Sequence, residues 1–234
     1  MATAQWGYQP VATLDETTRA DFIVRVYQHL LLAVVAFVAF ETLLISLGAA
    51  EAIYNFVARS SASWLLILGA FMIVNWLATS AAHDILNPSR QYAGLFALAG
   101  GQALIFAPFL HYIFEVQTGG TATVASAAVI TAFGFAGLSA VAFTTRRDLS
   151  FIRPLMLWGG VSALVLILAA VLFGLELGVW FSVGMIALAG AAILYQTQTI
   201  LRRYPSDAHV GAAVQLFASV MLLFWYVLRL VSRR

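Results

Sequence analysis

The residues best suited to chemistry are polar side chains inside otherwise apolar stretches near the end of the chain. Gln196 and Gln198 lie two positions apart, and Gln215 and Ser219 follow in the next apolar stretch. In a membrane, such groups bind helices together by hydrogen bonds worth about 0.6–2 kcal/mol each, or they line a hydrated cavity. Their concentration in two adjacent segments predicts a shared polar core. These four residues and Glu41 are therefore the candidate lining of a pore.

Glu41 lies well inside the first apolar stretch, where an ionisable group is expensive and is often functional. One interpretation is a contact for a proton or a cation. The other is an interfacial carboxylate roughly two turns from the end of its helix. The sequence leaves both open. Asn75, Gln102 and His111 are further polar residues at membrane depth, and we expect them to join helices.

The sequence argues against an enzyme. Hydrolysis needs a nucleophile with a base in reach, and Ser139, in a Gly-Leu-Ser-Ala run, has no evident histidine partner. The chain has no cysteine, no His-Glu-x-x-His metal motif and no phosphate-binding glycine loop. We therefore predict no catalytic residue, no metal site and no cofactor.

These side chains must be positioned by elements that lipid surrounds. The 234 residues are 62% hydrophobic and 9% charged, whereas a soluble domain carries about 25% charged residues. A spanning helix needs about 20 apolar residues, and the apolar runs are continuous rather than alternating. The chain is therefore predicted to be an all-α membrane protein, a bundle of seven transmembrane helices. The expected windows are 29–48, 63–82, 92–114, 121–143, 152–173, 178–198 and 208–228.

The predicted organisation has three parts. A polar N-terminal segment covers residues 1–28, a single seven-helix domain covers 29–230, and a basic tail covers 231–234. The polar segment lacks the compact apolar stretch and cleavage site of a signal peptide, so we expect the first window to remain as a helix.

Arginines predict the orientation, because cytoplasmic loops carry an excess of basic residues. All 12 basic residues are Arg, and they fall mainly between the apolar windows, which is a topology signal and not a nucleic-acid footprint. Eight of them lie on the N-terminal side of a seven-span bundle and four on the other, which favours a cytoplasmic N-terminus in the cell (inner) membrane. The basic tail conflicts with this count, and a last helix that re-enters and returns would remove the conflict.

A family resemblance rests on four separated blocks. The block 132–150 is rich in small residues and ends in a Thr-Thr-Arg-Arg-Asp-Leu-Ser run that contains Arg146, Arg147 and Asp148. Three further blocks, at 22–30, 91–109 and 195–229, occur with it in the same order and at similar spacing, so that the resemblance covers residues 20–231. Together they resemble the Bax inhibitor-1 (transmembrane Bax inhibitor motif) family, in a bacterial branch.

The resemblance implies a seven-helix bundle with a central, partly re-entrant last helix. It also implies an association with calcium leak, modulation by pH and suppression of cell death, and in some bacterial members with a membrane-bound protease. The family's pH sensor is a pair of aspartates on the last two helices, at the positions of Gln196 and Ser219 here. Gln and Ser cannot titrate, and calcium prefers carboxylate oxygens. The aspartate-gated mechanism is therefore not expected; Glu41 and His111 are the remaining candidates for a pH response.

Two functions remain open. The first is an ion leak, for calcium or another cation, along a polar path between the last two helices and the second. The second is a non-conducting regulator that binds a membrane protease or another membrane protein. In either case the lipid bilayer is the expected environment, and no nucleic-acid partner is predicted.

Overall fold

The structure is a computed structural model that describes residues 9–233, and in them it places eight α-helices and one short 3₁₀ helix. In chain order these are η1 (Val11–Thr13), α1 (Glu16–Ser46), α2 (Ala49–Ala58), α3 (Ser61–Ala82), α4 (Pro88–Val116), α5 (Gly120–Thr144), α6 (Ile152–Phe173), α7 (Val179–Arg203) and α8 (His209–Val231). All except α2 are long and apolar enough to cross a bilayer, seven in total. The predicted all-α bundle with seven spans is confirmed.

The first helix begins earlier than its apolar window because its start is capped. Asp15 accepts hydrogen bonds from the Thr17 hydroxyl and from the Thr18 amide (3.0 Å) and hydroxyl (2.9 Å). These bonds, with that of Thr17 the strongest, hold the pKa of the Asp15 carboxyl well below its usual range. An acidic cap of this kind satisfies free amides at a helix start. Helix α1 therefore begins at Glu16, inside the polar N-terminal segment predicted for residues 1–28. Residues 1–8 of that segment and Arg234 of the tail lie outside the described residues.

The remaining boundaries follow local signals. Asn87 accepts a hydrogen bond from the Arg90 amide at the start of α4. Pro88 occupies the first helical position, where a backbone N–H would have no partner within the helix, so its missing N–H costs nothing. Gly48, with φ of 71°, makes the tight turn between α1 and α2. With only 10 residues, α2 is too short to cross a bilayer, and hydropathy windows of spanning length overlook it.

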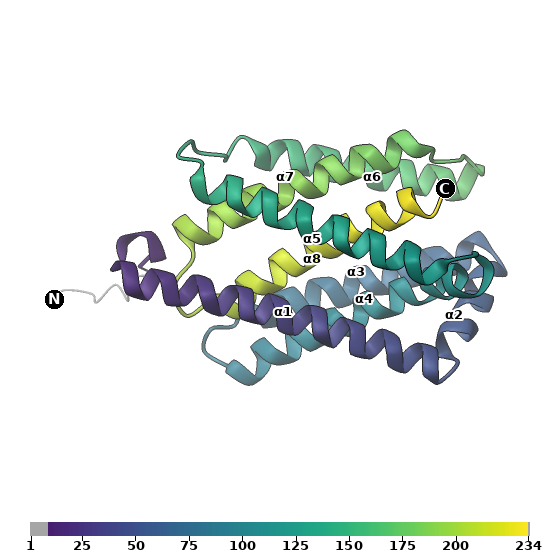
Figure 1. Ribbon diagram of the computed structural model, residues 1–234, viewed down its shortest axis with the longest axis horizontal. Coiled ribbons are helices and arrows are strands. Elements are labelled where there is room, and N and C mark those ends of the chain that lie inside the picture. The colour runs from purple at the N-terminus through teal and green to yellow at the C-terminus, as the bar shows by residue number, and fades with distance from the viewer. Residues whose placement is uncertain (1–8, 234) are drawn as a thin grey trace.

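The last helix lies at the centre of the bundle (Figure 1). It packs against α1, α3, α4, α5 and α7, and Leu216, Phe217 and Leu228 on it are fully buried. In contrast, α6 contacts chiefly α7 and leaves most of its surface exposed, as expected for a lipid-facing helix. Residues on α8 are therefore in position to contact polar groups from most other spans.

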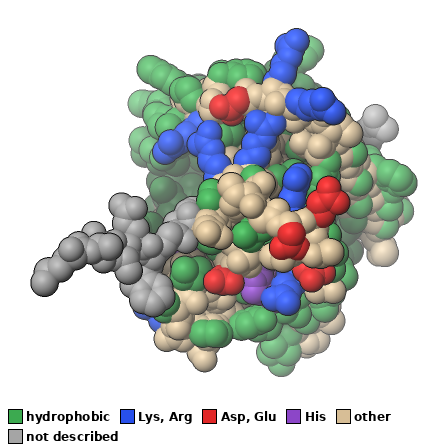
Figure 2. All heavy atoms as spheres, turned by 90° about the vertical axis from the view of Figure 1, so that its left-hand side faces the viewer, with side chains coloured by type: hydrophobic (Ala, Val, Ile, Leu, Met, Phe, Trp, Pro, Cys, Tyr) green, Lys and Arg blue, Asp and Glu red, His purple; other side chains and the backbone are tan. Residues whose placement is uncertain are grey.

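The two ends of the described chain lie at opposite ends of the bundle (Figure 1). Helix α8 is one unbroken helix of 23 residues, so of the two alternatives for the last helix the structure favours a full span over re-entry. Figure 2 shows the end that carries the N-terminus, where arginine, aspartate and glutamate side chains gather among polar loops. We call this the N-terminal end and the other, which carries Arg229 and Arg233, the C-terminal end.

Candidate functional site

Gln196 and Ser219 meet in the middle of the bundle. The Ser219 hydroxyl on α8 donates a hydrogen bond of 2.9 Å to the Gln196 side-chain carbonyl on α7. Ser219 is buried and Gln196 is half-buried. Neither group ionises, so this contact joins the two helices without charge. It occupies the positions at which the resembled family carries its aspartate pair.

A cavity of about 440 Å³ lies beside Ser219. It is separate from another cavity, of about 570 Å³, on the other side of α8. Helices α3, α4, α6, α7 and α8 enclose this smaller cavity, which we call the Ser219 chamber. Asn75, Gln102 and Ser219 give it neutral polar groups, and its other walls are apolar. Of the residues predicted to line a polar path between the last two helices and the second apolar window, only Ser219 lines this chamber, and the path stays a prediction.

A second hollow adjoins the chamber at the C-terminal end. Its volume is about 580 Å³, and it is lined by Glu176, Arg229 and Arg233, among others. Trp64 and Trp225 line both hollows, and their rings stack with centroids 6.1 Å apart. We call this hollow the outer cavity. The two tryptophans therefore lie at the boundary between it and the Ser219 chamber.

Two guanidinium groups define the charge of the outer cavity. Arg229 and Arg233 each donate a hydrogen bond of 3.1 Å to the carbonyl oxygen of Leu177, in the loop between α6 and α7. Glu176 provides the opposing charge. Two positive groups against one negative group make this opening electropositive, which favours anions over cations near it.

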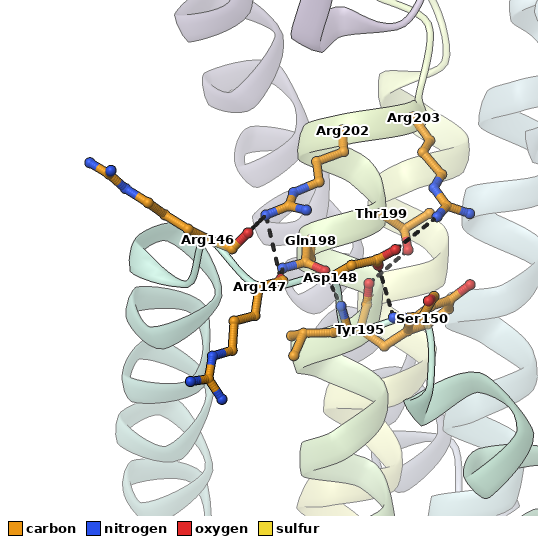
Figure 3. Close-up of polar contacts among 10 residues, drawn as sticks. Arg146, Arg147, Asp148, Ser150, Tyr195, Gln198, Thr199, Arg202 and Arg203 are labelled. Atoms are coloured by element: carbon orange, nitrogen blue, oxygen red, sulfur yellow. Dashed lines mark hydrogen bonds and ion pairs between the residues drawn. The ribbon is translucent and has the colours of Figure 1, made fainter.

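Gln198 does not join the polar core, contrary to our prediction. Its side-chain carbonyl accepts a hydrogen bond of 2.7 Å from the Leu149 amide, and its amide group donates one of 2.7 Å to the Arg147 carbonyl. Arg202, one turn further along α7, donates to the Arg146 carbonyl at 2.9 Å (Figure 3). The α5–α6 loop is thus fixed to the end of α7, because both polar side chains bind its backbone.

The Arg-Arg-Asp run of that loop keeps its charged groups at the surface. Arg146, Arg147 and Asp148 are all exposed, and the two arginine side chains point away from α7 (Figure 3). Asp148 accepts a hydrogen bond of 3.0 Å from the Ser150 amide and lies 3.9 Å from Arg203. The family motif therefore forms a rigid basic loop at the N-terminal end and lines neither the Ser219 chamber nor the outer cavity.

Gln215 and Glu41 are also separate from the Ser219 contact. Gln215 accepts a hydrogen bond of 2.7 Å from the Tyr204 hydroxyl, which lies 3.2 Å from a ring nitrogen of His83. Glu41 is buried on the α1 side of α8, in a different cavity. Of the five predicted pore residues, the structure brings Gln196 and Ser219 into contact. Gln198, Gln215 and Glu41 lie apart from them, so the predicted polar core shared by all five is not what the structure shows.

Arg202 and Tyr204 are the residues that sequence reasoning missed. The available signal was spacing, since Arg202 follows Gln198 by one helical turn and therefore shares its face. Among the described residues, no group of three acidic, histidine or cysteine side chains is placed to hold a metal ion.

Comparison with known proteins places this geometry in a family. The family model described as "Inhibitor of apoptosis-promoting Bax1" matches residues 19–234. An uncharacterized protein of Pseudomonas aeruginosa is 33% identical over 147 residues, and the match covers 62% of this chain and 64% of that protein, slightly less than two thirds of its length. Uncharacterized proteins of Neisseria meningitidis serogroups A and B are each 27% identical over 187 residues, covering 78% of this chain and 80% of theirs. With its seven candidate spans, this chain belongs to the Bax inhibitor-1 (Bax1-I) family of multi-pass membrane proteins.

Proposed function

We propose that this protein is an ion leak protein whose path runs from the outer cavity through the Ser219 chamber and which has no acid-operated gate. The observation that supports the proposal is the chamber beside Ser219, since three neutral polar side chains, Asn75, Gln102 and Ser219, line it from well inside their candidate spanning helices. Polar groups at this depth are expensive unless they pair or line a hydrated space.

The Ser219–Gln196 contact is the proposed closure of this path. It joins α7 to α8 at the inner wall of the chamber, and breaking it requires the two helices to separate. A hydrogen bond between neutral groups is worth only about 0.6 kcal/mol in a membrane, so thermal motion can open it without a change in protonation. The leak is therefore expected to be slow and continuous.

The lining predicts weak calcium selectivity. Calcium prefers carboxylate oxygens, and the chamber offers amide and hydroxyl groups only. The Arg229 and Arg233 guanidiniums at the outer cavity also oppose the approach of a divalent cation. Calcium remains the ion suggested by the family resemblance, and we expect it to pass more slowly than monovalent ions.

The proposed orientation puts the N-terminal end in the cytoplasm. The start of α1, with Arg19 and Arg25, and the basic α5–α6 loop belong to that end, whereas Arg229 and Arg233 of the outer cavity belong to the end of α8 on the opposite side. The excess of arginine at the N-terminal end supports this assignment in the cell membrane. A reporter fused to the C-terminus should then be found outside the cytoplasm.

Reconstitution in liposomes tests the leak. The parent chain should release entrapped calcium and potassium faster than empty liposomes do. Ala218→Phe places a ring in the Ser219 chamber and should stop the release, whereas Ala128→Phe, which lies on the α1 side of α8, should leave it unchanged. Release no faster than from empty liposomes, from a parent protein that remains folded, would exclude the leak function.

A second function has its own supporting observation, which is the rigid basic loop. Gln198 and Arg202 hold the loop backbone, while Arg146 and Arg147 remain exposed. A preorganised basic surface suits an acidic partner, because little conformational freedom is lost on binding. Under this alternative the protein regulates a membrane protease or another membrane protein. Crosslinking of native membranes should then recover one stoichiometric partner, and Arg146→Gln with Arg147→Gln should remove it.

A further inference from the structure

A groove on the opposite side of α8 from the Ser219 chamber has no part in the proposed leak. It has a volume of about 570 Å³ and lies between α1, α4, α5 and α8. On α1 its lining runs from Tyr27 to Ile45, a distance of about 27 Å at the helical rise. This nearly equals the hydrocarbon thickness of a bilayer, which is about 30 Å. We call this space the Glu41 groove.

The groove is open to lipid along its flank. Leu31 and Val38, which line it, are 64% and 54% exposed, and Ala128 and Ala132 on α5 are also exposed. Toward the N-terminal end the Tyr27 ring bounds it, tilted against Phe135 and stacked on Phe143, with centroids 5.9 Å and 6.2 Å apart. A long molecule can therefore enter sideways from the membrane and lie along α1.

Glu41 gives this apolar groove one strongly polar group. Its side chain lines the groove and is 5% exposed, and neither carboxyl oxygen has a hydrogen-bond partner among the described residues. Buried polar groups in proteins are almost always hydrogen bonded, and an unpaired one is costly whether or not it is charged. The groove thus has an unmet requirement for a hydrogen-bond donor about one turn from the end of α1.

A partner helix would remain largely outside the groove. One turn of a helix about 10 Å across and about 5.4 Å long already takes up roughly 400 Å³, so the groove would hold little more than a single turn. A slender molecule fits instead, since sites for small ligands have volumes of about 300–1,000 Å³ and mostly apolar walls.

We propose that the Glu41 groove binds a single-chain amphiphile whose head group donates a hydrogen bond to the Glu41 carboxyl and whose apolar chain lies along α1. Long-chain alcohols and long-chain amines share this chemistry. They differ in charge, because only the protonated amine can form an ion pair with a carboxylate. An ionised fatty acid has the wrong head group, since its carboxylate has no hydrogen to donate and would meet another carboxyl group.

The experiment measures binding of hexadecylamine and hexadecanol to the full chain in nanodiscs, with empty nanodiscs as the background. At least one probe should bind saturably at one molecule per protein, and palmitate should compete poorly. Glu41→Leu should weaken that binding at least tenfold, and Ala128→Phe should block it by filling the groove. Glu51→Gln, an acid on the exposed surface of α2, is the matched control and should bind like the parent.

The two probes separate the charged from the neutral form of the interaction. If the amine is the ligand, Glu41→Gln should abolish its binding; if the alcohol is the ligand, Glu41→Gln should retain it, since an amide also accepts a hydrogen bond. Thermal unfolding of each variant shows whether it is folded. The proposal is overturned if neither probe binds the folded parent, or if folded Glu41→Leu and Ala128→Phe both bind as the parent does. Ala218→Phe should retain binding, so this result is independent of the leak.

Discussion

Gln196 and Gln198 lie on the same helix two residues apart, but they belong to different regions of the molecule. Two residues along an α-helix differ by about 200° in direction, so Gln196 faces α8 while Gln198 faces the α5–α6 loop. One contributes a single bond inside the membrane, and the other organises a surface loop through several. Residue type and membrane depth alone therefore do not identify a pore residue. The helix face on which a polar side chain lies determines which groups it contacts.

The largest effect should come from the loop region. Gln198→Ala removes bonds to the Leu149 amide and the Arg147 carbonyl and leaves those backbone groups without their side-chain partner. At about 1 kcal/mol per bond, we expect a loss of about 2–3 kcal/mol in unfolding free energy. Thermal unfolding in detergent measures it. An unfolding temperature equal to that of the parent would show that the loop is not held by Gln198.

A smaller effect is expected one turn further along the same face. Arg202→Gln removes the bond to the Arg146 carbonyl and should cost about 1 kcal/mol. It should also speed amide hydrogen exchange in the α5–α6 loop while leaving exchange in α8 unchanged. Exchange that rises equally in both regions would assign Arg202 to general stability instead of to the loop.

The core pair should contribute less. A double-mutant cycle of Gln196→Ala and Ser219→Ala should give a coupling energy of about 0.6 kcal/mol, the usual value for hydrogen bonds between membrane helices. A value above that for the Gln198 contacts would reverse the comparison and make the core pair the main polar contact of α7.

The smallest effect should be at the surface ion pair. Arg203 and Asp148 are 3.9 Å apart, and both side chains are 60% exposed. Such pairs rarely contribute more than about 0.5 kcal/mol, so Arg203→Gln should leave unfolding unchanged at moderate salt. A clear destabilisation that salt abolishes would indicate that charge, rather than Gln198 and Arg202, positions the loop.

Sequence reasoning was sufficient for the fold because hydropathy is a property of each segment by itself. The seven spans are signals of this kind. In contrast, the partners of Gln198 lie about 50 residues away along the chain, and only the packing of helices brings them near. The short helix α2, the Ser219 chamber and the Glu41 groove likewise depend on how elements meet. The sequence could suggest Glu41 as a functional residue, but not that α1 and α5 leave a groove beside it.

The absence of an acid-operated gate is tested most directly by measuring ion release from liposomes between about pH 5 and about pH 8. The measurement compares the parent with the double variant Gln196→Asp with Ser219→Asp. Two carboxyl groups at hydrogen-bond distance share a proton and titrate as a coupled pair. The account predicts a pH-independent rate for the parent and a pH-dependent rate for the double variant alone. A parent whose rate varies with pH as strongly as that of the double variant would contradict it.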